Sequence, residues 1–159
     1  MRGRVLRILG LTSLLVSGAG IAWADFCKDL EVVLESARDG FSAVRGDLVS
    51  RHQDPLSDTR VIWQCTQALT GAQTCEVEWL RQAFTYNTFW HKQDEQTNAA
   101  TFQALTELLV GCGLMQKQTS KSGRSALYGS EGQTDLDIVL AYNSRRVRLS
   151  VTASGFPNP

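Results

Sequence analysis

The sequence predicts an α+β domain in which two helices pack on one face of a mostly antiparallel β-sheet, in the order helix, strands, helix, strands. Residues 25–39 and 94–112 repeat apolar side chains every three or four positions, as the buried stripe of a helix does. Residues 60–80 and 134–153 alternate apolar and polar side chains on either side of a turn, as β-hairpins do. Helices and strands grouped in this order indicate the α+β class.

The first 24 residues have the features of a secretory signal peptide. Three arginines lie among the first seven residues, residues 8–16 are mostly apolar, and Ala22-Trp23-Ala24 matches the small-x-small pattern that signal peptidase cleaves. The apolar run is short for a membrane span, and an uncleaved anchor is the alternative. We expect cleavage after Ala24, a single mature domain of residues 25–159, and export through the general secretory route to the periplasm or outside of a bacterium.

Charge narrows the choice of partners. The signal peptide contains three of the 16 basic residues and none of the 16 acidic ones, so the mature chain has a formal charge of −3. Nucleic-acid binding is disfavoured because it usually requires a strongly basic surface. The chain has no internal sequence repeats. We expect an unknown protein or envelope ligand as the partner, no nucleic acid, and no membrane span after signal removal.

The first helix is expected over residues 25–39. Its apolar stripe consists of Phe26, Leu30, Val33, Leu34 and Ala37. Gly40 suits the helix end because glycine adopts a positive φ readily. Residues 41–49 are expected as a short extended segment or loop, followed by a polar loop. His52 and Asp54 in that loop could contact a metal, but two candidates without a third ligand indicate solvated residues.

The register of the first hairpin follows from its turn. Leu69-Thr70-Gly71 fits a three-residue loop that ends in a left-handed glycine. That register places three pairs on one face of the strands: Cys65 opposite Cys75, Trp63 opposite Val77, and Val61 opposite Trp79. A third strand is expected over residues 84–91. Its core face carries Phe84, Tyr86 and Trp90, and its other face carries Thr85, Asn87, Phe89 and His91.

The second half repeats the same two patterns. A helix is expected over residues 94–112, with Gly113 as its cap. Residues 116–125 are rich in Gln, Ser, Lys and Gly and are expected as a loop. In the last hairpin, Asn143-Ser144 is a workable two-residue turn. That turn pairs apolar residues across the strands: Leu140 with Val147, Ile138 with Leu149, and Leu136 with Val151.

All four cysteines lie beyond the signal peptide. An even number of cysteines in an oxidising compartment indicates two disulfides, for which three pairings are possible. The hairpin register favours Cys65–Cys75, which leaves Cys27–Cys112. Cys27 begins the first helix and Cys112 ends the second, and antiparallel neighbouring helices bring those ends together. The sequence has no C-x-x-C motif, which argues against a redox enzyme and a zinc ribbon.

The sequence indicates a small exported binding or interaction protein without catalytic activity. It contains no nucleophile elbow, metal cluster or phosphate-binding loop, so we assign no catalytic residue, no metal and no cofactor. One alternative is a small secreted hydrolase or toxin that uses His52, His91 and scattered carboxylates. A cleft that joins one histidine to a carboxylate or serine would favour it. The other alternative is an inhibitor of an envelope enzyme, for which a rigid protruding loop at residues 116–125 would be the sign.

A partner is expected to bind the sheet face opposite the helices. That face is predicted to carry Gln64, Thr66, Glu76, Glu78, Asn87, Phe89, His91, Asp137, Arg146 and Arg148. Among these we predict that Phe89, His91, Arg146 and Arg148 contribute to binding, with Phe89 as an exposed aromatic anchor among charges. The alternative is an ordinary solvated sheet face, since one side of an antiparallel sheet often meets water.

Overall fold

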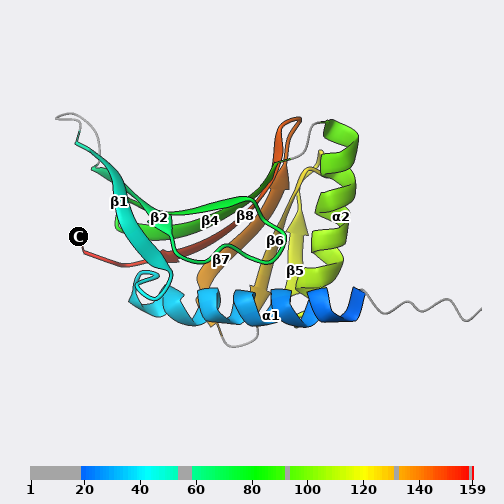
Figure 1. Cartoon of the computed structure of the whole chain (residues 1–159), viewed down its shortest axis with the longest axis horizontal. Helices are drawn as coiled ribbons and strands as arrows, with labels where there is room; N and C mark the ends of the chain where they lie inside the picture. Colours follow the sequence, from blue (N-terminus) through cyan, green and yellow to red (C-terminus); the bar gives the residue numbers. More distant parts are fainter. Residues whose placement is uncertain (1–18, 54–58, 92–93, 131–132, 158) are drawn as a thin grey trace, which may run out of the picture.

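The computed structural model describes all residues except 1–18, 54–58, 92–93, 131–132 and 158. It contains two α-helices and one eight-stranded antiparallel sheet, which confirms the α+β class (Figure 1). The elements in chain order are α1 (Ala19–Ser36), the 3-10 helix η1 (Ala37–Asp39), β1 (Arg45–His52), β2 (Arg60–Cys65), β3 (Thr74–Leu80), β4 (Ala83–His91), α2 (Glu95–Gly111), β5 (Met115–Thr119), β6 (Ser125–Ser130), β7 (Gln133–Tyr142) and β8 (Arg146–Ser154).

The sheet is arranged as two halves of the same topology. Each half is a helix followed by four antiparallel strands, and the strand order is β1-β2-β3-β4-β8-β7-β6-β5. The halves therefore run outward from a central β4–β8 pair, and β1 and β5 form the two edges. No repeat in the sequence accompanies this symmetry. The strands that carry the four predicted binding residues, β4 and β8, are consequently the two central ones.

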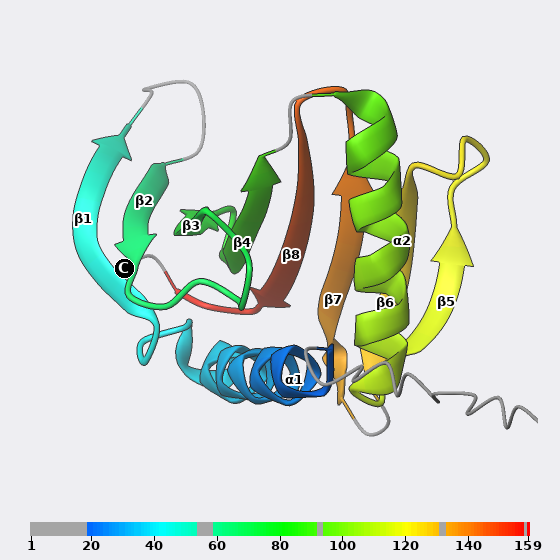
Figure 2. The same ribbon diagram turned by 45° about the vertical axis from the view of Figure 1, so that its right-hand side comes forward.

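The two helices lie differently on the sheet but contribute to the same core. Figures 1 and 2 show α1 lying crosswise at one end of the strands, whereas α2 runs beside β6 and β7. The buried apolar residues of the helices are Phe26, Leu30 and Val33 from α1, and Phe102, Leu105 and Leu109 from α2. They form one cluster with the apolar side chains of a single sheet face, including Tyr86 and Leu149. The helices thus cover one face, and the opposite face is called the open face below.

The helix ends follow the predicted chemistry with shifted boundaries. Gly40 has φ 70° and Gly113 has φ 88°, so both take the left-handed conformation expected after a helix. A Cβ on Gly40 would also lie 2.8 Å from the Phe84 ring, which excludes any larger residue there. At the start of α2, the Asp94 carboxylate accepts a hydrogen bond from the Thr97 amide at 2.7 Å. That bond lowers the pKa of Asp94, because it stabilises the ionised form.

Helix α1 begins before the expected cleavage site. The helix starts at Ala19 and continues through Ala24 without a break, whereas residues 1–18 of the predicted signal peptide lie outside the described residues. Removal of residues 1–24 would leave α1 beginning at Asp25, a residue type that suits a helix N-terminus electrostatically. No helix in the described part of the chain is long and apolar enough to cross a membrane. Cleavage after Ala24 remains a prediction.

The first hairpin has the predicted register but a longer loop. Val61 lies opposite Trp79 and Trp63 lies opposite Val77. A disulfide joins Cys65 to Cys75, whose Cα atoms are 5.5 Å apart. Strand pairing stops at this bridge instead of continuing to a three-residue loop. Gly71 still adopts the predicted left-handed conformation, with φ 81°, in a tight turn between Leu69 and Ala72.

Helix α1 holds the loop of the first hairpin over residues 66–73. The two carboxylate oxygens of Asp29 accept hydrogen bonds from the side-chain amide of Gln67 at 2.7 Å and from the Thr70 hydroxyl at 2.6 Å. The Tyr86 hydroxyl donates to the Gln67 carbonyl oxygen at 2.9 Å. The Asp29 contacts bind side chains of the loop, and the Tyr86 contact satisfies a backbone carbonyl that is not paired in the strand ladder. They could not be found from local sequence patterns, because Asp29 is 38 residues from Gln67.

The two edge strands lie largely in segments for which no regular strand was predicted. Residues 45–52 form β1, where a short extended segment or loop and then a polar loop were expected, and residues 115–119 form β5, which overlaps the segment 116–125 that was expected as a loop. Most side chains of β1 and all side chains of β5 are exposed. An edge strand of this kind lacks an alternating apolar pattern, because neither face is buried. Residues 120–124 form a tight turn between β5 and β6, so the segment belongs to a β-hairpin.

The predicted register of the last hairpin is wrong by two residues. Leu140 pairs with Leu149 and Ile138 pairs with Val151, because the connection is longer than Asn143-Ser144. The Asn143 side-chain oxygen accepts hydrogen bonds from the backbone amides of Arg145 and Arg146, at 2.8 and 3.0 Å. This cap stabilises a wider turn. Since side chains alternate with a period of two, the shift keeps every residue on its predicted face.

Removal of each disulfide is predicted to destabilise the domain by a different amount. Cys27 and Cys112 are 85 residues apart, and Cys65 and Cys75 are 10 apart. By the chain-entropy model, replacing the first pair with alanine should lower the free energy of unfolding by about 4.5 kcal/mol, and the second by about 2.7 kcal/mol. Urea unfolding of the two double variants measures both values. The reverse order would contradict an entropic role for the long bridge.

Tyr86 is predicted to make the domain unstable in alkali. Burial raises the pKa of Tyr86 to about 12, because the ionised phenol is poorly solvated inside the core. The unfolded chain would release this proton near pH 10, so the stabilisation is complete below pH 10 and is lost as pH rises towards 12. We expect a loss of about 2 kcal/mol over that range. In Tyr86→Phe, urea unfolding should show a shallower pH dependence; an equally steep one would assign the effect to other groups.

Candidate functional site

The structure brings the four predicted binding residues together on the open face. Phe89 lies directly opposite Arg148, and His91 lies directly opposite Arg146, on the adjacent strands β4 and β8. Cross-strand neighbours on one face lie within side-chain contact distance. We call these four residues the β4–β8 cluster. It lies where β4 ends and β8 begins, at the centre of the strand order.

Phe89 is not the exposed anchor that the sequence predicted. Its relative exposure is only 7%. The guanidinium carbon of Arg146 lies 4.6 Å from the centre of the Phe89 ring, a cation–π arrangement, and the His91 ring stacks on it at 6.0 Å. The sequence reasoning placed Phe89 on the correct face but could not show that its neighbours would cover it. Phe89 therefore forms the floor of the cluster, and the charged side chains form its surface.

His91 is held by hydroxyl and amide groups. Its ring nitrogen Nε2 lies 3.1 Å from the Thr74 hydroxyl oxygen, and its backbone amide donates to the Gln73 side-chain oxygen at 2.8 Å. No described contact joins His91 to a carboxylate or a serine, which is the arrangement that a hydrolase would need. His52 lies on β1, three strands away in the sheet. The structure does not bring the two histidines into one site.

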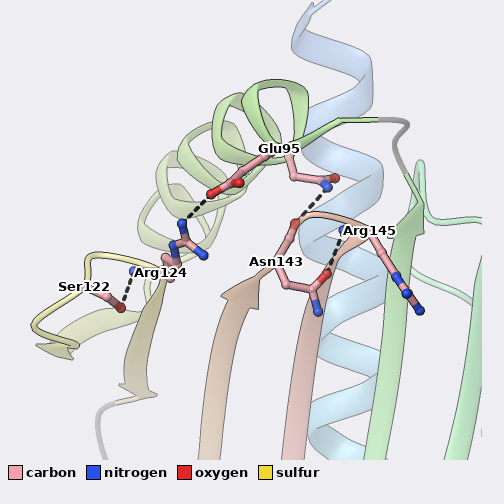
Figure 3. A network of polar contacts seen from close by, with 6 residues as sticks. Glu95, Ser122, Arg124, Asn143 and Arg145 are labelled. Atoms are coloured by element: carbon pink, nitrogen blue, oxygen red, sulfur yellow. Dashed lines mark hydrogen bonds and ion pairs between the residues drawn. The ribbon is translucent and has the colours of Figure 1, made fainter.

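Arg146 and Arg148 are exposed and are not neutralised by the described carboxylates. The described ion pairs join Arg60 to Glu78 and Arg124 to Glu95, and neither involves the β4–β8 cluster. Figure 3 shows the Arg124–Glu95 pair between the β5–β6 turn and α2, beside the Asn143 cap of the last hairpin. The cluster thus presents two guanidinium groups to solvent in a chain whose formal charge is +0 as a whole.

A small hollow lies next to the two arginines. Its volume is about 160 Å³, and its lining residues are Ala141, Tyr142, Asn143, Arg146 and Arg148. Arg148 has Phe89 as its neighbour on β4 and Ala141 as its neighbour on β7. The short side chain of Ala141 leaves room beside Arg148. The sequence reasoning missed Ala141 and Asn143. It treated Asn143 as part of a two-residue turn, and therefore did not show that the Asn143 side chain caps a wider turn beside the hollow.

The rest of the open face is polar and partly internal. The Ser150 hydroxyl donates to the Asn87 side-chain oxygen at 2.7 Å, and both residues are buried. Asn87 is therefore structural, although it was predicted as part of the accessible face. Glu76 and Glu78 lie on β3, and Asp137 lies on β7 opposite Thr152. A second hollow of about 260 Å³ is lined by Gln64, Cys65, Thr66, Ala68, Gln73, Thr74 and Cys75.

The described residues contain no group of three or more His, Cys, Asp or Glu side chains that could hold a metal ion. His52 is exposed at the end of β1. Asp54, the second weighed ligand, lies outside the described residues.

Comparison of the chain with protein-family models, curated proteins and solved structures finds no match. Neither a family nor a known activity can be transferred to it. The functional argument therefore depends on the residues of the open face themselves, and above all on the β4–β8 cluster.

Truncation of Phe89 is predicted to destabilise the domain, whereas truncation of Arg148 is predicted to leave its stability nearly unchanged. Phe89→Ala removes a buried ring and should lower the free energy of unfolding by about 3 kcal/mol. Arg148→Ala removes an exposed side chain and should change it by less than about 0.5 kcal/mol. Urea unfolding of the two variants, which lie opposite each other across β4 and β8, measures the difference. Equal losses would contradict the assignment of one as floor and the other as surface.

Proposed function

We propose that this chain is an exported, disulfide-bonded, non-catalytic domain that binds a protein or ligand of the cell envelope through the β4–β8 cluster. The observation that carries the proposal is the position of Arg146 and Arg148. Both are exposed, neither is paired with a described carboxylate, and both project from the central strand β8 next to buried Phe89. Unpaired arginines fixed on a rigid surface are typical of binding sites.

The two disulfides support the exported location. Cysteine pairs of this kind form and persist in oxidising compartments and are rare in the reducing cytosol. The charged and apolar segments of the N-terminus and the Ala22-Trp23-Ala24 pattern support cleavage by signal peptidase. Together they favour a periplasmic or extracellular domain that begins at Asp25.

The placement of the cluster supports binding over catalysis. Strands β4 and β8 are each paired on both sides, so the cluster is built on internal strands of the sheet and not on an edge. Surface groups that are already ordered lose little conformational entropy when a partner binds. The His91 ring contacts the Thr74 hydroxyl and the Phe89 ring, and no carboxylate is among its described contacts. The group that would orient a histidine base in a nucleophilic relay is therefore not seen among those contacts.

The processing step can be tested first. We expect the protein recovered from envelope fractions to have the mass of residues 25–159 with two disulfides. Signal peptidase should remove residues 1–24, because their charged and apolar segments precede an Ala-x-Ala site. Intact-mass spectrometry under non-reducing conditions measures both features. A chain that still begins at Met1 would contradict cleavage, and a free thiol would contradict the two bridges.

Partner binding is tested with paired surface variants. The mature protein is immobilised and exposed to envelope extract in parallel with an Arg146→Ala/Arg148→Ala variant and a Lys28→Ala control. Lys28 is an exposed cation on α1, on the helix side of the sheet. We expect a species that wild type and the Lys28 control capture and that the double variant loses at least 10-fold. Equal capture by all three proteins would place the binding surface elsewhere.

A further inference from the structure

We propose that the hollow between Arg146, Arg148 and Asn143 binds a phosphate group in its dianionic form. The inference rests on the proposed function, since it names the chemistry that the β4–β8 cluster recognises. It starts from the shape of the site. The hollow has a volume of about 160 Å³ and exists because Ala141 is the short neighbour of Arg148 on β7. Ligand pockets for whole organic molecules are about 300–1,000 Å³, so this one fits a single anionic group.

The donors around the hollow are suited to an oxyanion. Arg146 and Arg148 are two positions apart on one strand and therefore emerge on the same face about 7 Å from each other. Each guanidinium offers several N–H donors in a planar fork, which matches the oxygens of phosphate. The Asn143 side-chain oxygen is already occupied by the amides of Arg145 and Arg146, so its amide nitrogen is the group left to donate to a ligand.

Charge decides between phosphate and carboxylate. Arg146 and Arg148 both line the hollow, and none of its lining residues is acidic. A carboxylate carries one negative charge and satisfies a single arginine fork, whereas a phosphate dianion matches both cations and has enough oxygens to bridge them. The stacking of Arg146 on the Phe89 ring holds one of these cations in place without neutralising it. The site therefore favours the dianion.

The direct test is a titration of the ¹⁵N-labelled mature protein with sodium phosphate at constant ionic strength, followed by NMR. We expect saturable shifts centred on the backbone amides of residues 141–148, with a dissociation constant in the millimolar range that a single group can provide. Sodium acetate should bind at least 10-fold more weakly. Shifts that do not saturate, or an equal response to acetate, would overturn the proposal.

Three variants test separately the charge of the arginines, the shape of the hollow, and a cation elsewhere on the surface. Arg148→Gln removes one cation and should weaken phosphate binding at least 10-fold. Ala141→Leu keeps both arginines but fills the hollow, and it should weaken binding by a similar factor. Lys28→Gln removes one exposed cation on α1 and should leave the titration unchanged. If Ala141→Leu binds phosphate as wild type does, the arginines act as an open charged surface and the proposed site is wrong.

Two further comparisons identify the source of the phosphate and separate this inference from the proposed function. Sedimentation with phosphatidylcholine vesicles that contain phosphatidic acid, whose phosphomonoester can carry two negative charges, would place the phosphate on a lipid if Arg148→Gln abolishes it. Vesicles that contain phosphatidylglycerol, whose phosphodiester carries one negative charge, are the matched control and should sediment the protein more weakly. No sedimentation, together with a positive NMR titration, would place it on a soluble ligand. If the titration fails but the Arg146→Ala/Arg148→Ala variant still loses partner capture, the phosphate site is wrong and the binding function stands. If the titration succeeds and that double variant captures the partner as wild type does, the partner surface is wrong.

Discussion

The antiparallel pairing of β4 with β8 is the constraint on which the rest of the fold depends. Each half of the chain ends in one of these strands, and their register runs continuously from Ala83 opposite Ser154 to His91 opposite Arg146. This pairing joins two four-stranded sheets into one and aligns the two apolar strand faces beneath the helices. The Cys27–Cys112 bridge ties the helices of the two halves covalently, with Cα atoms 5.3 Å apart. The surface residues on β4 and β8 therefore lie on a backbone that is hydrogen-bonded on both sides.

Local patterns in the sequence were sufficient for the first half of the fold. The Cys65 and Cys75 positions and the Trp63–Val77 pair follow from strand alternation and one left-handed glycine, because a hairpin is a local structure. The edge strands could not be found in this way, since β5 has no buried side chain to create a pattern. The join between β4 and β8 was also beyond the sequence. It brings together residues about 60 positions apart, and nothing in either segment specifies that neighbour.

The candidate site was predicted in outline for a physical reason. Side-chain direction in a strand has a period of two, so Phe89, His91, Arg146 and Arg148 were assigned to the correct face even though the hairpin register was wrong by two. Burial within that face depends on neighbours and was not predictable. Phe89 is covered because β8 places Arg146 above its ring. The hollow depends on Ala141, whose importance appears only when β7 is placed beside Arg148.

The clustering of cations explains why an anion should bind there and not elsewhere. Arg145 directly precedes β8, and Arg146 and Arg148 lie in its first three positions. Like charges at this spacing repel one another within the screening length of about 10 Å at 0.1 M salt. The folded backbone holds them together because the β4–β8 ladder and the Asn143 cap fix the strand. A bound dianion removes that repulsion and gains hydrogen bonds at the same time. Relief of the repulsion between these arginines therefore adds to the affinity for the ligand.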